Sequence, residues 1–326
     1  GAWRVEGGIL TQGAVVALVN YMSQILVELI KLADLIINIT KAVACGNRIQ
    51  KVLEVEPSME NGSKECIEEK NTQENAVDFN HVSLTYAGAG APSLTDIDLH
   101  VKTGQTIGII GGTGSGKTSV VNLIPRFYDA TQGNVLVLGK PVKEQDMESL
   151  RSQIAIVPQK AVLFAGTIRE NMKWGKEDAT DEEIMEALTI AQAAEVVQKK
   201  EGGLDAFVEQ GGKNLSGGQR QRLTIARALV RKPRILILDD SASALDFATD
   251  AALRKAIREM KNAPTVFIVS QRTSSIRFAD QILVLDDGKS VGVGTHDELL
   301  TTCSVYKEIY DSQYKKTDGK KSGKEA

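Results

Sequence analysis

The chain has 326 residues and a formal net charge of -3, a length that suits one large domain or two smaller ones. Hydrophobic residues make up 42% and charged residues 25%, an ordinary globular balance with no basic excess for binding nucleic acid. Its three cysteines, Cys45, Cys66 and Cys303, lie far apart without a CxxC spacing, so we expect reduced thiols and neither a disulfide framework nor a cysteine-based metal site.

The first 54 residues are dominated by a predicted long helix over residues 13–50, a stretch without proline. Residues 14–30 are mostly apolar and come close to the roughly 20 residues that a membrane span needs. Four polar residues within or just after this stretch share one helical face: Asn20, Gln24, Glu28 and Lys31. At this point two interpretations stay open: a soluble amphipathic helix with a solvated stripe, or a membrane helix whose polar face lines an aqueous pathway.

Residues 55–74 are rich in charge, glycine and serine, and we predict that they form a linker. From residue 75 to 316, short apolar runs alternate with helical stretches, which is typical of an α/β fold with strands buried on both faces of a largely parallel sheet. The apolar runs are residues 106–110, 154–157, 235–238, 266–269 and 282–285. Residues 317–326 form a basic tail, for which disorder is favoured over a role at a membrane surface.

A phosphate-binding loop is predicted at residues 111–118, where GGTGSGKT matches GxxxxGK[ST] between an apolar run and a helical stretch. Glycines let consecutive backbone N–H groups converge on phosphate oxygens, and the helix N-terminus adds a positive dipole end. Lys117 is expected to contact the β- and γ-phosphates of ATP, and Thr118 to bind Mg²⁺. The predicted ATP contacts here are Gly111, Gly112, Thr113, Gly114, Ser115, Gly116, Lys117, Thr118 and Ser119.

Two further motifs are compatible with nucleotide binding. Residues 235–239 predict a buried strand that ends in Asp239, a position suited to holding Mg²⁺ because ligands bind at the carboxyl ends of strands in open α/β sheets. A second anion site is predicted before the helical run 220–230, at Leu215, Ser216, Gly217, Gly218 and Gln219. One nucleotide does not need two distant phosphate cradles, but two chains facing head to tail would use both.

These motifs, in this order, resemble the Walker A, LSGGQ and Walker B sequences of an ABC ATPase over roughly residues 75–316. The resemblance implies a P-loop NTPase core of ABC type, with an antiparallel β subdomain and a helical subdomain at about 160–230. It also implies that Tyr86 stacks on adenine, with a core strand aromatic as the alternative, and that Gln159 reaches Mg²⁺ and the attacking water. Asp246, in the D-loop sequence SALD, would touch the opposite site of a dimer.

The segment LFAGTIREN at residues 163–171 resembles exporters specifically. Residues 1–54 look like the end of an exporter's fifth membrane helix, an external loop, and the sixth helix with its cytoplasmic extension. Because the sequence begins with Gly1, we expect a truncated transport domain that lacks the first five helices. The resemblance favours the pathway interpretation of the polar face. It implies a subunit of the cell membrane with a cytoplasmic nucleotide-binding domain, a second half-transporter as partner, and a transported substrate that the sequence does not identify.

Two positions depart from the family pattern. Asp240 follows the Walker B aspartate where a water-polarising Glu is usual, and its side chain is shorter by about 1.5 Å. A misplacement of about 1 Å can lower a rate about a hundredfold. Gln271 occupies the switch position where a His is usual, and an amide can hydrogen-bond a γ-phosphate but cannot carry a proton to it. Gln210, near the signature, replaces a usual Glu and is weaker support.

We therefore predict that Asp240, Gln159 and Gln271 are the catalytic positions of a degenerate site, in one half of a heterodimeric exporter. This chain's LSGGQ would complete the competent site of its partner. A homodimeric exporter with tolerated substitutions and a regulatory module with little turnover remain alternatives. A soluble ABC ATPase of DNA repair or translation is disfavoured, because the sequence has neither a long coiled-coil insertion nor a second ATPase cassette.

Overall fold

The computed structural model describes residues 7–8, 11–64 and 75–318, and it divides into two compact units, Gly1–Glu60 and Asn61–Ala326. The division falls inside the predicted linker. Residues 65–74 of that linker, including Cys66, and residues 319–326 of the predicted tail lie outside the described residues.

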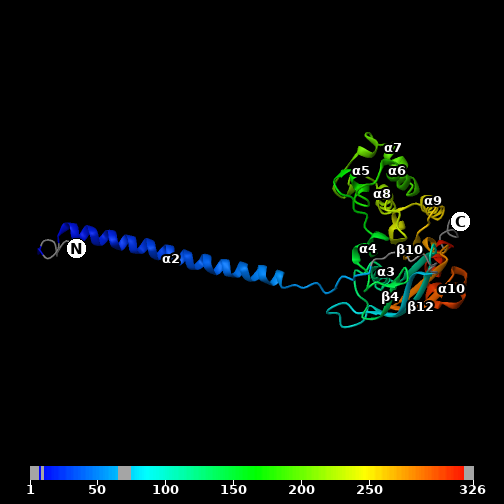
Figure 1. Cartoon of the computed structure of the whole chain (residues 1–326), viewed down its shortest axis with the longest axis horizontal. Helices are drawn as coiled ribbons and strands as arrows, with labels where there is room; N and C mark the ends of the chain where they lie inside the picture. The colour runs from blue at the N-terminus through cyan, green and yellow to red at the C-terminus, as the bar shows by residue number, and fades with distance from the viewer. Residues whose placement is uncertain (1–6, 9–10, 65–74, 319–326) are drawn as a thin grey trace, which may run out of the picture. The chain divides into compact units, whose positions relative to one another are not determined.

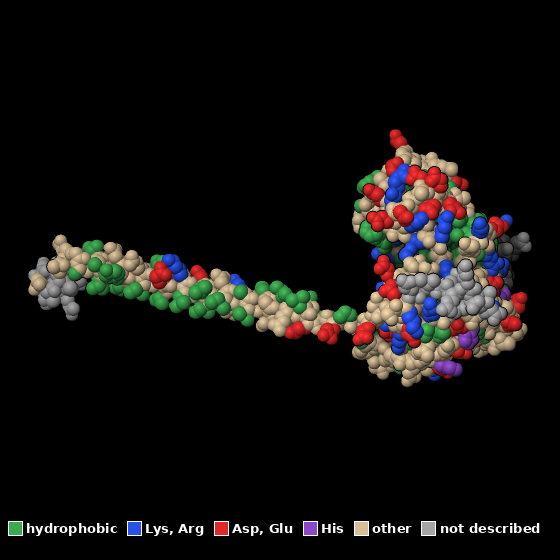
Figure 2. Space-filling view, viewed as in Figure 1, with side chains coloured by type: hydrophobic (Ala, Val, Ile, Leu, Met, Phe, Trp, Pro, Cys, Tyr) green, Lys and Arg blue, Asp and Glu red, His purple; other side chains and the backbone are tan. Residues whose placement is uncertain are grey.

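The N-terminal unit is essentially one helix, α2 (Gln12–Leu53), in agreement with the long helix expected from the sequence. It begins at Thr11, whose side chain accepts a hydrogen bond from the backbone N–H of Ala14. None of its residues is buried, and apolar side chains cover much of its surface, as Figure 2 shows. By length and composition, α2 is the one helix in the described part of the chain that could cross a membrane.

The larger unit is built on a ten-stranded sheet with the strand order β5-β4-β1-β2-β12-β11-β3-β10-β9-β6. Its central strands run parallel and are buried along nearly their whole length, which explains the continuous apolar runs in the sequence. These strands are β3 (Thr106–Gly111), β6 (Ile154–Val157), β9 (Ile235–Asp239), β10 (Thr265–Val269) and β11 (Gln281–Asp286).

An antiparallel region forms the other end of this sheet. β1 pairs with both β2 and β4 in antiparallel fashion, and β12 is antiparallel to β11. Polar and apolar residues alternate along β2, the pattern of a strand with one solvated face. The strands are β1 (Asn75–Leu84), β2 (Leu94–Lys102), β4 (Gln132–Val137), β5 (Lys140–Pro141) and β12 (Lys289–Gly294).

Helices cover the sheet or gather in a separate group. The group contains α5 (Ile168–Lys173), α6 (Asp181–Ile190), α7 (Ala194–Gln198) and α8 (Gly217–Leu229), and Figure 1 shows it set apart from strands β4 and β12. The short strands β7 (Gly166–Thr167) and β8 (Phe207–Val208) pair beside it. The remaining helices are α3 (Lys117–Leu123), α4 (Met147–Ser152), α9 (Phe247–Arg258), α10 (His296–Thr302) and α11 (Ser304–Asp318).

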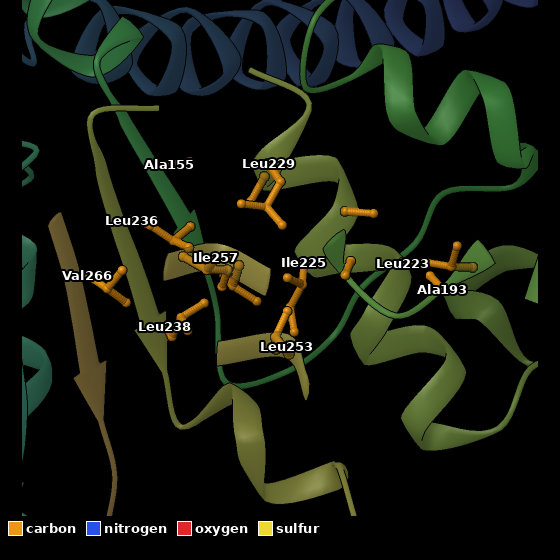
Figure 3. Close-up of a cluster of buried hydrophobic side chains, with 14 of the residues drawn as sticks. Ala155, Ala193, Leu223, Ile225, Leu229, Leu236, Leu238, Leu253, Ile257 and Val266 are labelled. Atoms are coloured by element: carbon orange, nitrogen blue, oxygen red, sulfur yellow. The ribbon is translucent and has the colours of Figure 1, made fainter. Parts of the chain in front are cut away.

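The described core falls into two clusters of buried apolar side chains, one of which joins the helical group to the parallel strands. In Figure 3, Leu229 and Ile225 of α8 lie beside Leu236 and Leu238 of β9. The helix that follows the signature sequence therefore shares a core cluster with the strand that ends in Asp239, and the strand it packs against directly is β6. The predicted fold class, an α/β P-loop core with an antiparallel β region and a helical region, is confirmed.

Candidate nucleotide-binding site

The parallel register brings the carboxyl ends of three strands to one edge of the sheet. Val269 pairs with Ile109 on one side and with Asp239 on the other, so β3, β10 and β9 end together. The glycine-rich loop leaves β3 at this edge and leads into α3. The sheet thus holds the predicted phosphate loop and the predicted Mg²⁺ ligand next to each other.

The loop from Gly111 to Gly116 needs glycine for two physical reasons. Gly114 and Gly116 have φ angles of 84° and 93°, a region that side chains rarely adopt. A Cβ on Gly116 would also approach a methyl carbon of Leu94 to 2.7 Å, whereas a Cβ on Gly112 or Gly114 would meet open space. The loop is therefore close-packed behind and open in front, as a phosphate cradle requires.

A cavity of about 410 Å³ opens at this loop. Its walls come from the loop and α3, from the segment before β2, and from the turn between β11 and β12. The lining residues are Ala91, Pro92, Ser93, Gly114, Gly116, Lys117, Thr118, Ser119, Asp287 and Gly288. The sequence motif supplied the loop side of this cavity, and the other two walls were not predicted.

Lys117 lies within this cradle and is largely buried. Its Nζ donates to the carbonyl oxygens of Gly111 at 2.9 Å and Gly112 at 2.6 Å. Burial lowers the pKa of Lys117, while the nearby carboxylates of Asp240 and Asp239 act in the opposite direction. A cation held in the loop beside exposed backbone N–H groups suits a polyphosphate.

Oxygen donors for a divalent cation meet beside the loop. The Thr118 hydroxyl donates to a carboxylate oxygen of Asp239 over 3.4 Å. Burial raises the pKa of Asp239, and the hydrogen bond from Thr118 partly opposes that rise. Hydroxyl and carboxylate oxygens are ligands that Mg²⁺ prefers, and this cation usually keeps several waters and adds substrate phosphates, so the donor set fits.

Asp240 and Gln159 also meet at this edge. The amide of Gln159 donates to a carboxylate oxygen of Asp240 over 3.3 Å, although they lie 81 positions apart in sequence. The backbone N–H of Asp240 donates to the Val269 carbonyl at 2.9 Å, and its φ of 47° is one that Asp adopts more readily than most residues. The predicted catalytic pair is therefore assembled next to Asp239.

Gln271 follows the end of β10, one residue after Ser270, whose N–H donates to the Ile109 carbonyl at 3.0 Å. This bond attaches the predicted switch segment to the strand that precedes the phosphate loop. The Gln271 carbonyl in turn accepts a hydrogen bond from Gln313 in α11, a contact between residues far apart in sequence that the sequence did not predict.

Tyr86 lies just after β1, half-buried beside α3. Its hydroxyl donates to the Ser119 hydroxyl at 2.9 Å, and its ring packs edge-on against Tyr128 with centroids 4.8 Å apart. Tyr86 also packs against the core. The alternative interpretation of Tyr86, as an aromatic side chain of a core strand, therefore describes part of its environment. The hydrogen bond to Ser119 places Tyr86 beside the first turn of α3, next to the phosphate loop.

The signature residues form a different kind of helix start. Ser216 caps α8 by accepting from the backbone N–H of Gln219, and the side-chain oxygen of Gln219 accepts in turn from the backbone N–H of Ser216. A Cβ on Gly218 would contact the Ala244 carbonyl, which places the signature beside the D-loop. Asp246 caps α9 through Thr249, and these hydrogen bonds lower its pKa. Leu215 belongs to the same local turn, since its N–H bonds to the Gly212 carbonyl.

The predicted site residues thus fall into two groups. Tyr86, the phosphate loop, Asp239, Asp240 and Gln159 meet at the edge of the sheet, whereas the signature and Asp246 meet at the starts of α8 and α9. Ser93 and Asp287 were missed as cavity walls. The Asp-Gly pair at 287–288 does predict a hairpin turn, but nothing in the sequence places that turn against the loop.

Comparison with known proteins agrees with this arrangement. Residues 94–243 match the family model for the ABC transporter domain. The chain is 43% identical over 315 residues to the uncharacterized ABC transporter ATP-binding protein YfiB of Bacillus subtilis, covering 96% of this chain and 54% of the relative. It is 38% identical over 313 residues to a probable multidrug resistance ABC transporter ATP-binding/permease protein, YheI, of the same organism, covering 96% and 53%.

Among solved structures, a bacterial Atm1-family ABC exporter with ATP bound is similar, with a TM-score of 0.79, 30% identity, and coverage of 96% of this chain and 55% of that one. The chain spans about half the length of the curated relatives it matches. The matched domain, the order of the motifs and the shared fold show that this chain belongs to the ABC transporter family.

Proposed function

We propose that this chain is the ATP-binding and ATP-hydrolysing part of an ABC exporter subunit that uses ATP-driven, head-to-tail pairing of nucleotide-binding domains to power export. The observation that carries the proposal is the gathering of Lys117, Thr118, Asp239 and Asp240 around one glycine-rich loop. The names of its relatives, which include multidrug export proteins, support the transport context.

Each residue of the cradle has a physical task toward ATP. Loop N–H groups and Lys117 bind the phosphates, and the ring of Tyr86 packs on the base. Thr118 and Asp239 would hold Mg²⁺, with Gln159 nearby as a further ligand, and the cation would neutralise negative charge on the phosphates. Asp240 then orients water at the γ-phosphate, and Gln271 donates a hydrogen bond to it.

We infer further that this site is degenerate. The short Asp240 carboxylate is already engaged by the Gln159 amide at 3.3 Å, and an amide at position 271 cannot move a proton. The intact LSGGQ of this chain would then serve the competent site of a different half-transporter. Two hypotheses compete with this one: a homodimer with tolerated substitutions, and an ATP-binding regulatory module. The hypotheses differ in which chains must pair.

Cysteine cross-linking distinguishes a heterodimer from a homodimer. Thr113→Cys marks the phosphate loop and Ser216→Cys marks the signature on the full-length chain, and both side chains are exposed. A heterodimer predicts an ATP-dependent cross-link from Ser216→Cys only to a co-expressed partner with a cysteine in its phosphate loop. A homodimer predicts the cross-link when the double variant is purified alone. Ser312→Cys, on α11, is the control, and no ATP-dependent cross-link in either preparation would contradict head-to-tail pairing.

For the N-terminal unit, we propose a membrane helix with Asn20, Gln24 and Glu28 facing the transport pathway and the nucleotide-binding domain on the cytoplasmic side. One face of α2 carries these groups together with Lys31, which pairs with Glu28 at 2.7 Å. Cysteines at positions 20, 24 and 28 of the full-length protein should react with a water-soluble maleimide. Cysteines at Leu18 and Met22 should not, and the reverse pattern would contradict this orientation.

A further inference from the structure

Helix α11 is anchored to the core at its beginning. Tyr306 is completely buried, and its hydroxyl hydrogen-bonds with Nδ1 of His296 at 2.7 Å. Burial raises the pKa of Tyr306 to about 12, so at neutral pH its hydroxyl keeps its proton. Cys303, just before the helix, is buried in the same core cluster, and Ile309 packs against it. The first turns of α11 therefore have a fixed position on the sheet.

Gln313 lies seven residues after Tyr306, on the same face of the helix. Its side-chain oxygen accepts two hydrogen bonds from Thr273, from the backbone N–H and from the hydroxyl, each at 3.0 Å. Its side-chain nitrogen donates to the backbone carbonyl of Gln271 at 2.8 Å. One amide thus holds both ends of the three-residue switch segment 271–273.

Besides Gln313, the switch segment is attached to Ser270 before it and to the turn after it. The carbonyl oxygens of Arg272 and Thr273 accept hydrogen bonds from backbone N–H groups of that turn. The N–H of Arg272 donates to the Ser270 hydroxyl at 3.0 Å, and Ser270 is attached to β3. Thr273 is completely buried, but Gln271 itself is exposed. Gln313 is also exposed, so its amide is not needed to fill the core. Two of its three hydrogen bonds act on the backbone on either side of Arg272, and the third holds the Thr273 hydroxyl. None of them uses the Gln271 side chain, which can turn toward a nucleotide.

We propose that Gln313 is a positioning residue for the γ-phosphate contact of Gln271. Because Tyr306 fixes α11, the amide of Gln313 fixes the position and direction of the Gln271 backbone. Less conformational entropy is then lost when the Gln271 side chain reaches the γ-phosphate. The inference rests on the proposed function, because it assigns Gln271 to ATP. It adds that the C-terminal helix is part of the discrimination between ATP and ADP.

The test compares ATP with ADP at this subunit's own site in the full-length transporter. Photolabelling on ice with 8-azido-ATP marks the chain that holds the adenine, and competition by ATP or ADP gives the two affinities. Gln313→Ala should weaken ATP about fivefold, the loss expected for one neutral hydrogen bond, and leave ADP unchanged. Ser312→Ala is the matched control, because within the described part of the chain that hydroxyl hydrogen-bonds to the Ile309 carbonyl alone, and it should change neither affinity.

Two further variants separate positioning from structural support. Gln313→Glu keeps the oxygen acceptor for Thr273 but replaces the donor to Gln271, so it should retain the thermal midpoint and still lose ATP affinity. Adding Gln313→Ala to Gln271→Ala should weaken ATP no further, because the first residue acts through the second. Equal losses for ATP and ADP, unchanged ATP affinity in Gln313→Ala, or independent losses in the double variant would each overturn the proposal. Lys117→Ala in the same assay checks the site itself: if it left labelling unchanged, the proposed function would fail.

Discussion

Two glycine-rich helix starts in this chain have opposite local structures. Gly116 precedes α3 with a left-handed backbone and no side-chain cap, so the first N–H groups of that helix are offered toward the loop cavity. Ser216 precedes α8 with an extended backbone, and the reciprocal bonds of Ser216 and Gln219 satisfy two of the donors there. Similar compositions therefore give one open start and one start that is already capped.

This difference explains why the two motifs suit different roles. The loop before α3 is surrounded by the Lys117 cation, the oxygens of Thr118 and Asp239, and a cavity that can admit a ligand. The signature has only its own capped turn and the neighbouring D-loop, and Gly217 faces open space. Within one chain, the first start has the groups that we propose bind phosphate, and the second is the surface that we propose completes a site on another chain.

The largest effect on the open start should come from Lys117→Ala. Removing this cation should weaken ATP binding to the chain about a hundredfold, since the contact it makes with phosphate is charge-assisted. Lys213→Ala removes an exposed lysine just before the signature and should change ATP affinity little. Isothermal titration calorimetry measures the ATP affinity of both variants. Equal effects of the two substitutions would erase the distinction between the two helix starts.

A smaller effect on ATP affinity is expected from Tyr86, which we propose contacts the adenine base. Tyr86→Ala should weaken ATP binding about tenfold and reduce discrimination between ATP and GTP, because base stacking is lost. Tyr86→Phe keeps the ring and removes only the hydrogen bond to Ser119, so it should stay within about fivefold of the parent. Fluorescent-nucleotide competition measures both. If Tyr86→Phe were as weak as Tyr86→Ala, the hydroxyl and its support of α3 would be the important feature.

The smallest effect concerns pH. Because burial raises the pKa of Asp239, its carboxylate takes up a proton at a higher pH than an exposed Asp does, and Mg²⁺ competes with that proton. The Mg²⁺-dependent part of ATP affinity should therefore fall as the pH is lowered, and the fall should begin at a higher pH than it would for an exposed Asp.

The same protonation does not destabilise the fold, because the folded chain binds that proton more tightly than the unfolded chain. Titrations with and without Mg²⁺ at each pH measure the effect. Asp239→Asn should lack the part of the pH dependence that the carboxylate contributes, and the same pH dependence of the Mg²⁺ contribution in the parent and in Asp239→Asn would show that Asp239 is not the ligand.

The features predicted from sequence were those with a local cause. The glycines at 114 and 116, the buried runs of β3, β6, β9, β10 and β11, and the helix that follows the signature depend on neighbours within a few residues. The ten-stranded order, the approach of Ser93 and Asp287 to the loop, and the clamp of Gln313 on Gln271 depend on residues brought together by the fold. No spacing in the sequence marks such pairs.

The predicted linker shows the same limit. Asn61 donates to Asp146 at 2.7 Å and accepts from the N–H of Met147 at 2.8 Å, and Lys64 pairs with Glu144 at 2.5 Å. Composition alone suggested a solvated segment at 55–74, yet its described residues 61–64 attach to the start of α4. Polar residues that hydrogen-bond to a distant helix end look, in sequence, like residues that contact only water.

Steady-state ATP hydrolysis by the purified pair of full-length subunits tests the central claim that this chain holds a degenerate site and supplies a working signature. Gly217→Asp places a negative charge where the signature meets the partner's γ-phosphate, and it should lower turnover by about a hundredfold or more. Asp240→Asn should change turnover by less than about threefold, because Asp240 is poorly placed as a base. A large loss with Asp240→Asn together with little loss with Gly217→Asp would contradict the account and assign hydrolysis to this chain's own site.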